Sequence, residues 1–151
     1  MPGFMDNMLR QIQPIKNQGM FFGTHDPDRK DPYCSTGDIA TVAAKWLLDA
    51  SWNGQQDIPV LGPEDLSCND MAQILSDVLG KPVRYQQIPL AALKAQLTER
   101  GATEAMAQGM IDMMVAKNEG LDHMVPRTAE GTTPTTFRQW CEEKLKPAVL
   151  S

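Results

Sequence analysis

The first eighteen residues constrain the fold most, because their pattern is typical of the middle of a domain, where a strand has just ended. Pro2-Gly3 is a step typical of the end of a strand, and an amphipathic helix follows it at once. Pro14 predicts a kink or an end in this helix, since proline lacks a backbone donor and crowds the preceding turn. Gly19 suits the end of the helix. The helical spacing is carried by Met5, Met8, Leu9, Ile12 and Ile15.

Size and charge exclude several classes of protein. The chain has 151 residues, 42% of them hydrophobic and 22% charged, which predicts one soluble globular domain over residues 1–151. The net charge of −5 and the lack of a basic run argue against nucleic-acid binding. No apolar stretch approaches the roughly 20 residues of a membrane helix, and the N-terminus lacks a signal-peptide layout. We therefore expect no membrane partner and a cytoplasmic location.

The cysteines and histidines do not form a recognisable metal or disulfide pattern. Cys34, Cys68 and Cys141 are an odd, widely spaced set without a CxxC pair, which favours buried free thiols. His25 and His123 fall in separate polar loops. We expect no metal.

Two helices are marked by the S-x-x-D pattern, in which a hydroxyl and a carboxylate satisfy the free N–H groups of a helix start. Ser35 to Asp38 opens the first, and an apolar stripe follows at Ile39, Val42, Ala43, Trp46 and Leu47. Ser67 to Asp70 opens the second, which Gly80 ends. Its stripe comprises Met71, Ile74, Leu75, Val78 and Leu79.

The strand signals are shorter. Met20–Thr24 and Asp31–Ser35 flank a charged turn and predict an antiparallel hairpin. Asp57–Leu61 is a short apolar run that predicts a buried strand, which Pro59 limits to an edge or to a missing ladder bond. Val83–Ile88 predicts a further strand.

The C-terminal half is predicted to be mostly helical. Pro89 suits the first turn of a helix that Gly101 ends, and Thr103 suits the cap of a helix over residues 104–119 with a methionine-rich face. A loop over residues 121–132 precedes a last helix opened by Thr133-Pro134. The expected fold class is α/β, in an α+β-like arrangement of about six helices with a few short strands.

The order of these segments resembles the NmrA-like atypical short-chain dehydrogenase/reductases, nearly end to end. The resemblance rests on Pro-Gly-Phe-Met-Asp-Asn, on Thr36-Gly37-Asp38-Ile39-Ala40, on Val60 to Ser67 and on Leu79 to Tyr85. In that family these segments form the carboxy-terminal, substrate-side half. The family's amino-terminal Rossmann half binds NAD(P). The resemblance implies that Asp57–Leu61 joins the parallel sheet.

We expect the dinucleotide-binding half to be absent from this chain. No G-x-G-x-x-G or G-x-x-G-x-x-G run is present to bring pyrophosphate to a helix N-terminus. The Tyr-x-x-x-Lys pair of short-chain reductases is missing too, because Gly37 follows Tyr33 at that spacing and Pro89 follows Tyr85. We therefore expect no cofactor for this chain alone, with NAD(P) only where a Rossmann half is supplied, and no catalytic residue.

Six residues form the predicted ligand-binding set. By resemblance, Phe4, Asn7 and Met8 face the cofactor and substrate cleft, although the preferred interpretation is that Phe4 and Met8 are core and Asn7 is a local cap. Met110 and Met114 could line an adaptable apolar pocket together with Phe22, although packing is the preferred interpretation of the methionines. Capping explains Asp38, Ser35 and Ser67 without a general base or a nucleophile.

Two functions remain open. The first is a non-catalytic module that binds a small apolar ligand or another protein and acts as a homodimer. The second is the C-terminal half of an NAD(P)-dependent oxidoreductase whose Rossmann half is absent or lies on another chain. In a complete relative, strand Asp57–Leu61 and the first helix would pack against the Rossmann sheet, so these surfaces should be covered by a second copy, by a Rossmann-domain partner or by a rearranged first segment. We expect residues 2–15 to lie on any partner surface.

Overall fold

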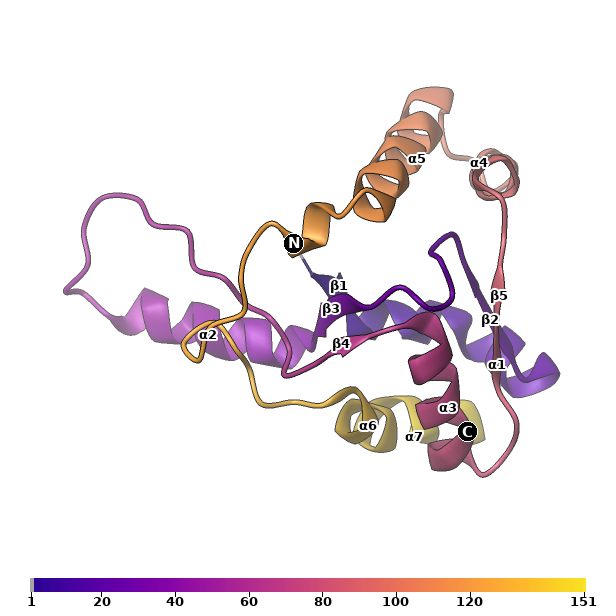
Figure 1. Ribbon diagram of the computed structural model, residues 1–151, viewed down its shortest axis with the longest axis horizontal. Helices are drawn as coiled ribbons and strands as arrows, with labels where there is room; N and C mark the ends of the chain where they lie inside the picture. The colour runs from indigo at the N-terminus through magenta and orange to yellow at the C-terminus, as the bar shows by residue number, and fades with distance from the viewer. Residues whose placement is uncertain (1) are drawn as a thin grey trace.

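Helix α3 (Cys68–Leu79) lies at the centre of the packed part of the molecule (Figure 1). The computed structural model describes residues 2–151. The capping box predicted from the sequence is present, with Ser67 Oγ accepting from the Asp70 N–H and the Asp70 carboxylate accepting from the Ser67 N–H. Gly80 ends the helix with a φ of 65°. The buried face of α3 comprises Cys68, Met71, Ala72, Leu75 and Val78.

The two ends of the chain complete this core. The first helical segment is a 3₁₀ helix, η1 (Met5–Gln11), that runs into α1 (Ile12–Gln18). Pro14 falls in the first turn of α1, where a missing donor breaks no helical hydrogen bond, so the helix ends only at Gly19. Helix α1 packs against α7 (Lys146–Leu150), and α3 packs against α6 (Phe137–Trp140). A π-helical turn, η3 (Cys141–Leu145), connects α6 to α7.

Two small sheets flank the helices. Strand β3 (Asp31–Cys34) pairs in parallel with β1 (Gly3–Phe4) and antiparallel with β4 (Asp65–Leu66). Strand β2 (Met20–Gly23) pairs in parallel with β5 (Arg84–Gln87), and Phe21 lies opposite Tyr85. Among residues 2–151, seven α-helices, two of them of only four or five residues, and a few short strands confirm the predicted α/β class.

The predicted hairpin of Met20–Thr24 with Asp31–Ser35 is wrong. Both segments are extended, but β2 pairs with β5 and β3 pairs with β1 and β4. The intervening turn is held by α3 instead, since the Asn69 N–H donates to the Pro27 carbonyl and the Asn69 amide donates to Asp28. The strand predicted over residues 83–88 is confirmed as β5.

The predicted strand Asp57–Leu61 is reduced to one residue. Leu61 forms an isolated parallel bridge with Thr132, whereas Asp57 and Ile58 are exposed and outside any strand. Proline cannot donate a ladder bond, which explains why the pairing does not extend back through Pro59. The last helix also starts later than predicted, because Thr136 rather than Thr133 caps α6.

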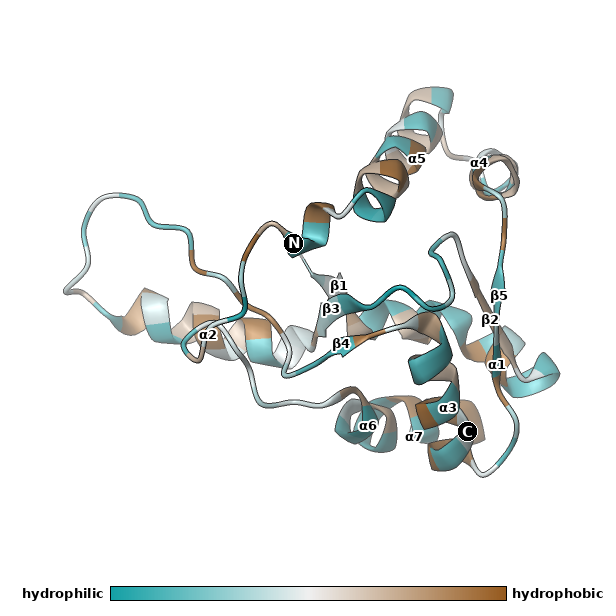
Figure 2. Ribbon diagram, in the orientation of Figure 1, coloured by the Kyte–Doolittle hydropathy of each residue, from teal (hydrophilic) through white to brown (hydrophobic). Residues whose placement is uncertain are grey.

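Helix α2 (Thr36–Leu48) extends away from the core (Figure 1). Ser35 caps it as predicted, but none of its residues is buried. Leu47 is 83% exposed and Leu48 87% exposed. Figure 2 shows apolar residues along this free helix. The first helical segment, by contrast, is covered within the chain, since Met5, Met8 and Ile15 are all in the core.

A helical hairpin forms the remaining part of the molecule. Helix α4 (Leu90–Glu99) turns at Gly101 into α5 (Glu104–Asn118), which Thr103 caps as predicted. A short 3₁₀ helix, η2 (Leu121–His123), lies inside the predicted loop. Among residues 2–151, no helix has the length and apolar character needed to cross a membrane.

Candidate functional site

A buried polar cluster centres on Asp31, where β3 meets the segment after α5. Asp31 is 4% exposed, and its carboxylate accepts from Arg29 at 2.8 Å and 3.2 Å. His123 Nε2 lies 2.9 Å from the other Asp31 oxygen, so the acceptor carboxylate selects the ring tautomer that carries its proton on Nε2. Arg29 also donates to the Asn118 carbonyl at the end of α5. The cluster thus joins three chain segments.

The end of β2 closes one side of this cluster. The Asn118 amide donates to the Thr24 carbonyl at 3.3 Å, and the Tyr85 hydroxyl donates to the His25 carbonyl at 2.9 Å. Burial lowers the pKa of His25; the Asp31 carboxylate raises it by a smaller amount, and the Arg29 guanidinium lowers it further, so the imidazole is neutral at pH 7. Burial raises the pKa of Tyr85 and keeps its hydroxyl protonated. These groups are suited to positioning and hydrogen bonding, not to nucleophilic chemistry.

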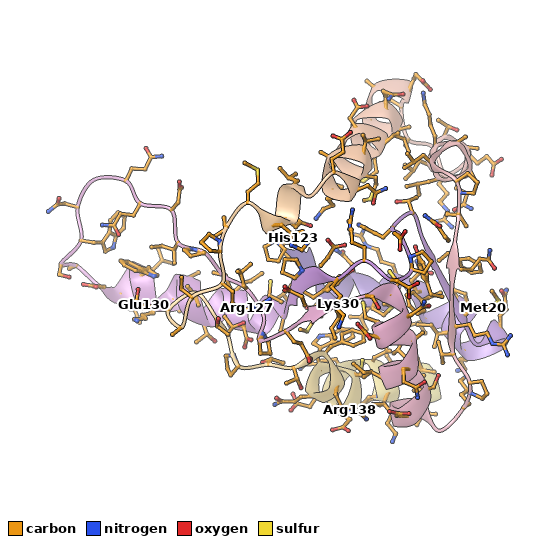
Figure 3. All side chains as sticks on the ribbon, in the orientation of Figure 1. Met20, Lys30, His123, Arg127, Glu130 and Arg138 are labelled. Carbon is orange, nitrogen blue, oxygen red and sulfur yellow. The ribbon has the colours of Figure 1, made fainter. Side chains whose placement is uncertain are left out.

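A small cavity of about 170 Å³ adjoins the cluster. Arg127, which is labelled in Figure 3, lines the cavity and donates to the Gly62 carbonyl and to Asp65. Its walls mix apolar and charged side chains, namely Pro32, Leu61, Asp65, Asp122, His123, Val125, Pro126 and Arg127. The cavity can hold a few atoms, which is far less than a drug-sized ligand requires.

No pattern in the sequence predicts this cluster. Asp31 and His123 are 92 positions apart, and each has only ordinary neighbours in the sequence. Among residues 2–151, no group of three or more His, Cys, Asp or Glu side chains could hold a metal ion.

The structure does not gather the six predicted ligand residues into one cavity. Phe4 is half-buried on β1, Asn7 is exposed on η1, and Met8 is in the core. Met8 therefore fits the packing interpretation. Phe22 on β2 is partly exposed, as are Met110 and Met114 on α5. Their role in ligand binding stays a prediction.

The predicted capping residues have structural partners. Asp38 accepts from the backbone N–H and the hydroxyl of Thr135, so it fixes the chain ahead of α6 and does not complete the α2 capping box. Asp6 caps that helix in its place by accepting from the Thr36 N–H at 2.9 Å. Neither serine cap has a histidine partner among the described hydrogen bonds. All three cysteines are free and buried, as predicted.

The N-termini of the three longest helices, α2, α3 and α5, are capped by side chains. Pyrophosphate binds where a strand turns into a helix through glycines that leave backbone N–H groups free. The starts of α2, α3 and α5 are instead covered by Ser35, Ser67 and Thr103. The positive-φ glycines lie after helices or in a loop, at Gly19, Gly54, Gly80, Gly101 and Gly120.

Comparison with known proteins adds the evolutionary context. The model of the NmrA-like family matches residues 1–141. The NAD(P)H azoreductase of Xenophilus azovorans is 35% identical over 113 residues, which cover 74% of this chain and 39% of the azoreductase. Festuclavine synthase II of Penicillium roqueforti is 32% identical over 149 residues, which cover 93% of this chain and 50% of the synthase.

Solved structures give the same picture for the fold. An NADPH-dependent quinone oxidoreductase from Escherichia coli superimposes with a TM-score of 0.71 at 22% identity, over 92% of this chain and 51% of the oxidoreductase. The triphenylmethane reductase of Citrobacter sp. complexed with NADP(H) has a TM-score of 0.69 at 18% identity, over 91% of this chain and 49% of the reductase. The chain thus spans about half or less of the length of these relatives.

Proposed function

We propose, from the premise that the chain belongs to the NmrA-like family, that it is the substrate-side lobe of an NAD(P)-dependent reductase. A separate nucleotide-binding lobe would hold the cofactor. The relatives named above include an NAD(P)H azoreductase, an NADPH-dependent quinone oxidoreductase and a festuclavine synthase, and this chain corresponds to about half or less of each. The capped helix starts support the view that the cofactor's pyrophosphate is held outside this chain.

The observation that carries this proposal is the uncovered helix α2. An amphipathic helix is normally stabilised by packing its apolar face, yet α2 buries no residue. Trp52 and Ile58 in the following loop are exposed beside the exposed leucines at the end of the helix. A nucleotide-binding lobe that packs on this side would cover all of them.

Strand β1 supports the same partner. It pairs in parallel with β3 and is the edge strand of its sheet. Parallel sheets occur almost only where strands and helices cover both faces, because the crossover helices bury them. A parallel strand from the partner lobe could extend the sheet at β1, which places Phe4 and the exposed Asn7 at the junction.

Within this arrangement the chain's own residues bind and position. Phe4, Phe22, Met110 and Met114 would offer apolar contacts to a small substrate, and Asn7 would offer an amide. The cofactor supplies the hydride when the nucleotide-binding lobe carries it. The surface that carries these five side chains would exclude water and orient the substrate.

A second candidate uses the same exposed face for self-association. In this alternative the chain is a non-catalytic ligand-binding homodimer, in which the α2 face of one copy packs on the same face of the other. In either case a partner should cover this surface, because four large apolar side chains are exposed at the end of α2 and in the loop that follows it. They are Leu47, Leu48, Trp52 and Ile58.

Co-expression with the Rossmann half of a family relative tests both candidates. If the chain is the lobe of a reductase, it should co-purify with that half in a one-to-one complex. The complex should bind NADPH, as measured by the fluorescence of the nucleotide, whereas the chain alone should not. Leu47→Asp should abolish the complex. Lys45→Glu is the matched control, since residues two apart point to nearly opposite sides of a helix.

Light scattering separates the candidates. A dimer of the chain alone that Leu47→Asp dissociates, without any complex with the Rossmann half, would favour the homodimer. A monomer that joins the Rossmann half supports the reductase lobe. A monomer that joins nothing would contradict both.

A further inference from the structure

The α4–α5 hairpin is attached to the rest of the chain differently from the core helices. Helix α4 buries no residue, and Ala107 is the only buried residue of α5 within the part of the chain that the structure describes. The two helices pack mainly on each other, supported by the Lys94–Glu104 ion pair and by a 2.7 Å bond from Lys94 to Gln108. The hairpin is therefore held together internally. Figure 1 shows it standing away from α3, α6 and α7.

Its described side-chain hydrogen bonds to the body are at one end. Arg29 donates to the last carbonyl of α5, and the Asn118 amide donates to Thr24. Just beyond α5, His123 bonds to Asp31. We refer to these five residues, Thr24, Arg29, Asp31, Asn118 and His123, as the latch. The latch is polar throughout, so its separation exposes little apolar surface.

The closed latch carries a penalty of its own. The hydroxyl of Thr24 and the amide oxygen of Asn118 are both buried without a hydrogen-bond partner among the described residues. A buried polar atom without a partner is destabilising, because it has lost its water without replacing it. Water would reach both atoms if the latch opened. Opening is thus favoured by rehydration of two groups and opposed by the bonds to Asp31 and to the Asn118 carbonyl.

The two connections of the hairpin are suited to hinge motion. The Ile88 N–H donates to the Gly23 carbonyl at 2.8 Å and anchors the chain up to that residue, and Pro89, which has no N–H, begins the free segment. On the other side, Met124 and Val125, which follow η2, are 78% and 46% exposed, so little packing restrains the chain where it leaves the lid.

We propose that residues 90–123, which comprise the hairpin and η2, form a lid that swings open as one unit at the latch while the α3 core stays folded. The lid carries Met110 and Met114, so its position decides how these side chains are presented to a ligand. His123 is the fastening residue, since it ties the exit of the lid to the buried carboxylate of Asp31. The lid is independent of the proposed reductase role, because it is a property of this chain alone.

Amide hydrogen exchange followed by mass spectrometry tests the lid directly. His123→Ala removes one bond to a charged group, and α5 amides should then exchange about tenfold faster, while α3 amides keep their rate. His123 is 44% exposed at its side chain, so the variant should fold. His123→Gln retains an N–H donor of similar reach and should give an intermediate rate.

Arg138→Ala is the control. It removes the exposed ion pair with Asp77 on α3, away from the latch, and should leave α5 exchange unchanged. Unchanged α5 exchange in His123→Ala would overturn the proposal. Equal acceleration in α3 and α5 would also overturn it, because the hairpin would then open only with global unfolding.

Discussion

The N-cap of α3 should be worth more to the stability of this protein than the N-cap of α2. The perturbation is Ser67→Ala, which removes the hydroxyl that accepts from the Asp70 N–H at 3.0 Å. Ser67 is 4% exposed, so water cannot easily replace it. N-cap serines contribute about 0.5–2 kcal/mol, and this burial places Ser67 in the upper part of that range, about 1.5–2 kcal/mol.

Ser35→Ala is the matched control because it makes the same chemical change at another buried N-cap. The bond it removes, from the Gly37 N–H, is longer at 3.2 Å, and Asp6 still caps the Thr36 N–H. More important, α2 buries no residue, so fraying of its first turn disturbs no core packing. We expect a loss below about 0.5 kcal/mol.

Urea unfolding followed by circular dichroism measures both losses. Thermal unfolding of the same variants gives a second measure, because in a chain of this size a loss of about 1.5–2 kcal/mol corresponds to a fall in Tm of roughly 3–8 °C. Equal losses in the two variants, or a larger one for Ser35→Ala, would refute the reasoning that packing of the helix, not the cap itself, sets the value of a cap.

Acid titration of Asp70→Asn gives an independent check on the capping box. The hydrogen bond from the Ser67 backbone holds the pKa of Asp70 below its usual value, so the ionised form is favoured in the folded chain. Its contribution to stability is present above about pH 4 and is lost as pH falls through the lower folded-state pKa. The difference between wild type and Asp70→Asn should therefore shrink in acid. A difference that grows as pH falls would contradict this assignment.

Three other expectations follow from the burial of single residues. Leu75→Ala, at a fully buried core position, should lower the free energy of unfolding by about 2–5 kcal/mol in urea titrations, whereas Leu48→Ala should change it by less than about 0.5 kcal/mol. The thiols should resist alkylation at pH 8 in the native chain and react fully in denaturant, since burial raises the pKa of Cys34 and Cys68 to about 11 and that of Cys141 to about 12. Stability should fall as pH drops from 6.5 through the lower folded-state pKa of His25, and His25→Gln should flatten this part of the pH–stability curve.

Local signals in the sequence predicted local structure well. The S-x-x-D start at Ser67 and the glycine stop at Gly80 both fix backbone groups within a few residues, so no distant contact can easily override them. The family resemblance, which depends on the order of such local segments, is confirmed for the same reason.

Pairing and exposure were less predictable because they depend on distant partners. The residues of Met20–Gly23 predict a strand, but its partner Arg84–Gln87 is about sixty residues away. The sequence instead favours pairing with the nearer extended segment Asp31–Ser35. The apolar stripes of α2 and α3 look alike in the sequence. The residues of the α2 stripe are nevertheless exposed or half-buried, whereas most of those of the α3 stripe are in the core. The Asp31–His123 contact left no trace in the sequence, since two ordinary polar residues carry it.

The packing of α1 against α7 has a consequence for how the chain is made. The core joins residues near position 5 to residues near position 149, so its contacts have very large sequence separation. Proteins with such contacts fold slowly, because the loop between the two ends must be closed first. On the ribosome, Met5, Met8 and Ile15 are synthesised before their core partners. Their side chains stay exposed until Phe137, Trp140 and Leu145 have emerged. At a synthesis rate of roughly 5–20 residues per second this wait lasts on the order of ten seconds, during which a chaperone would have time to bind the nascent segment.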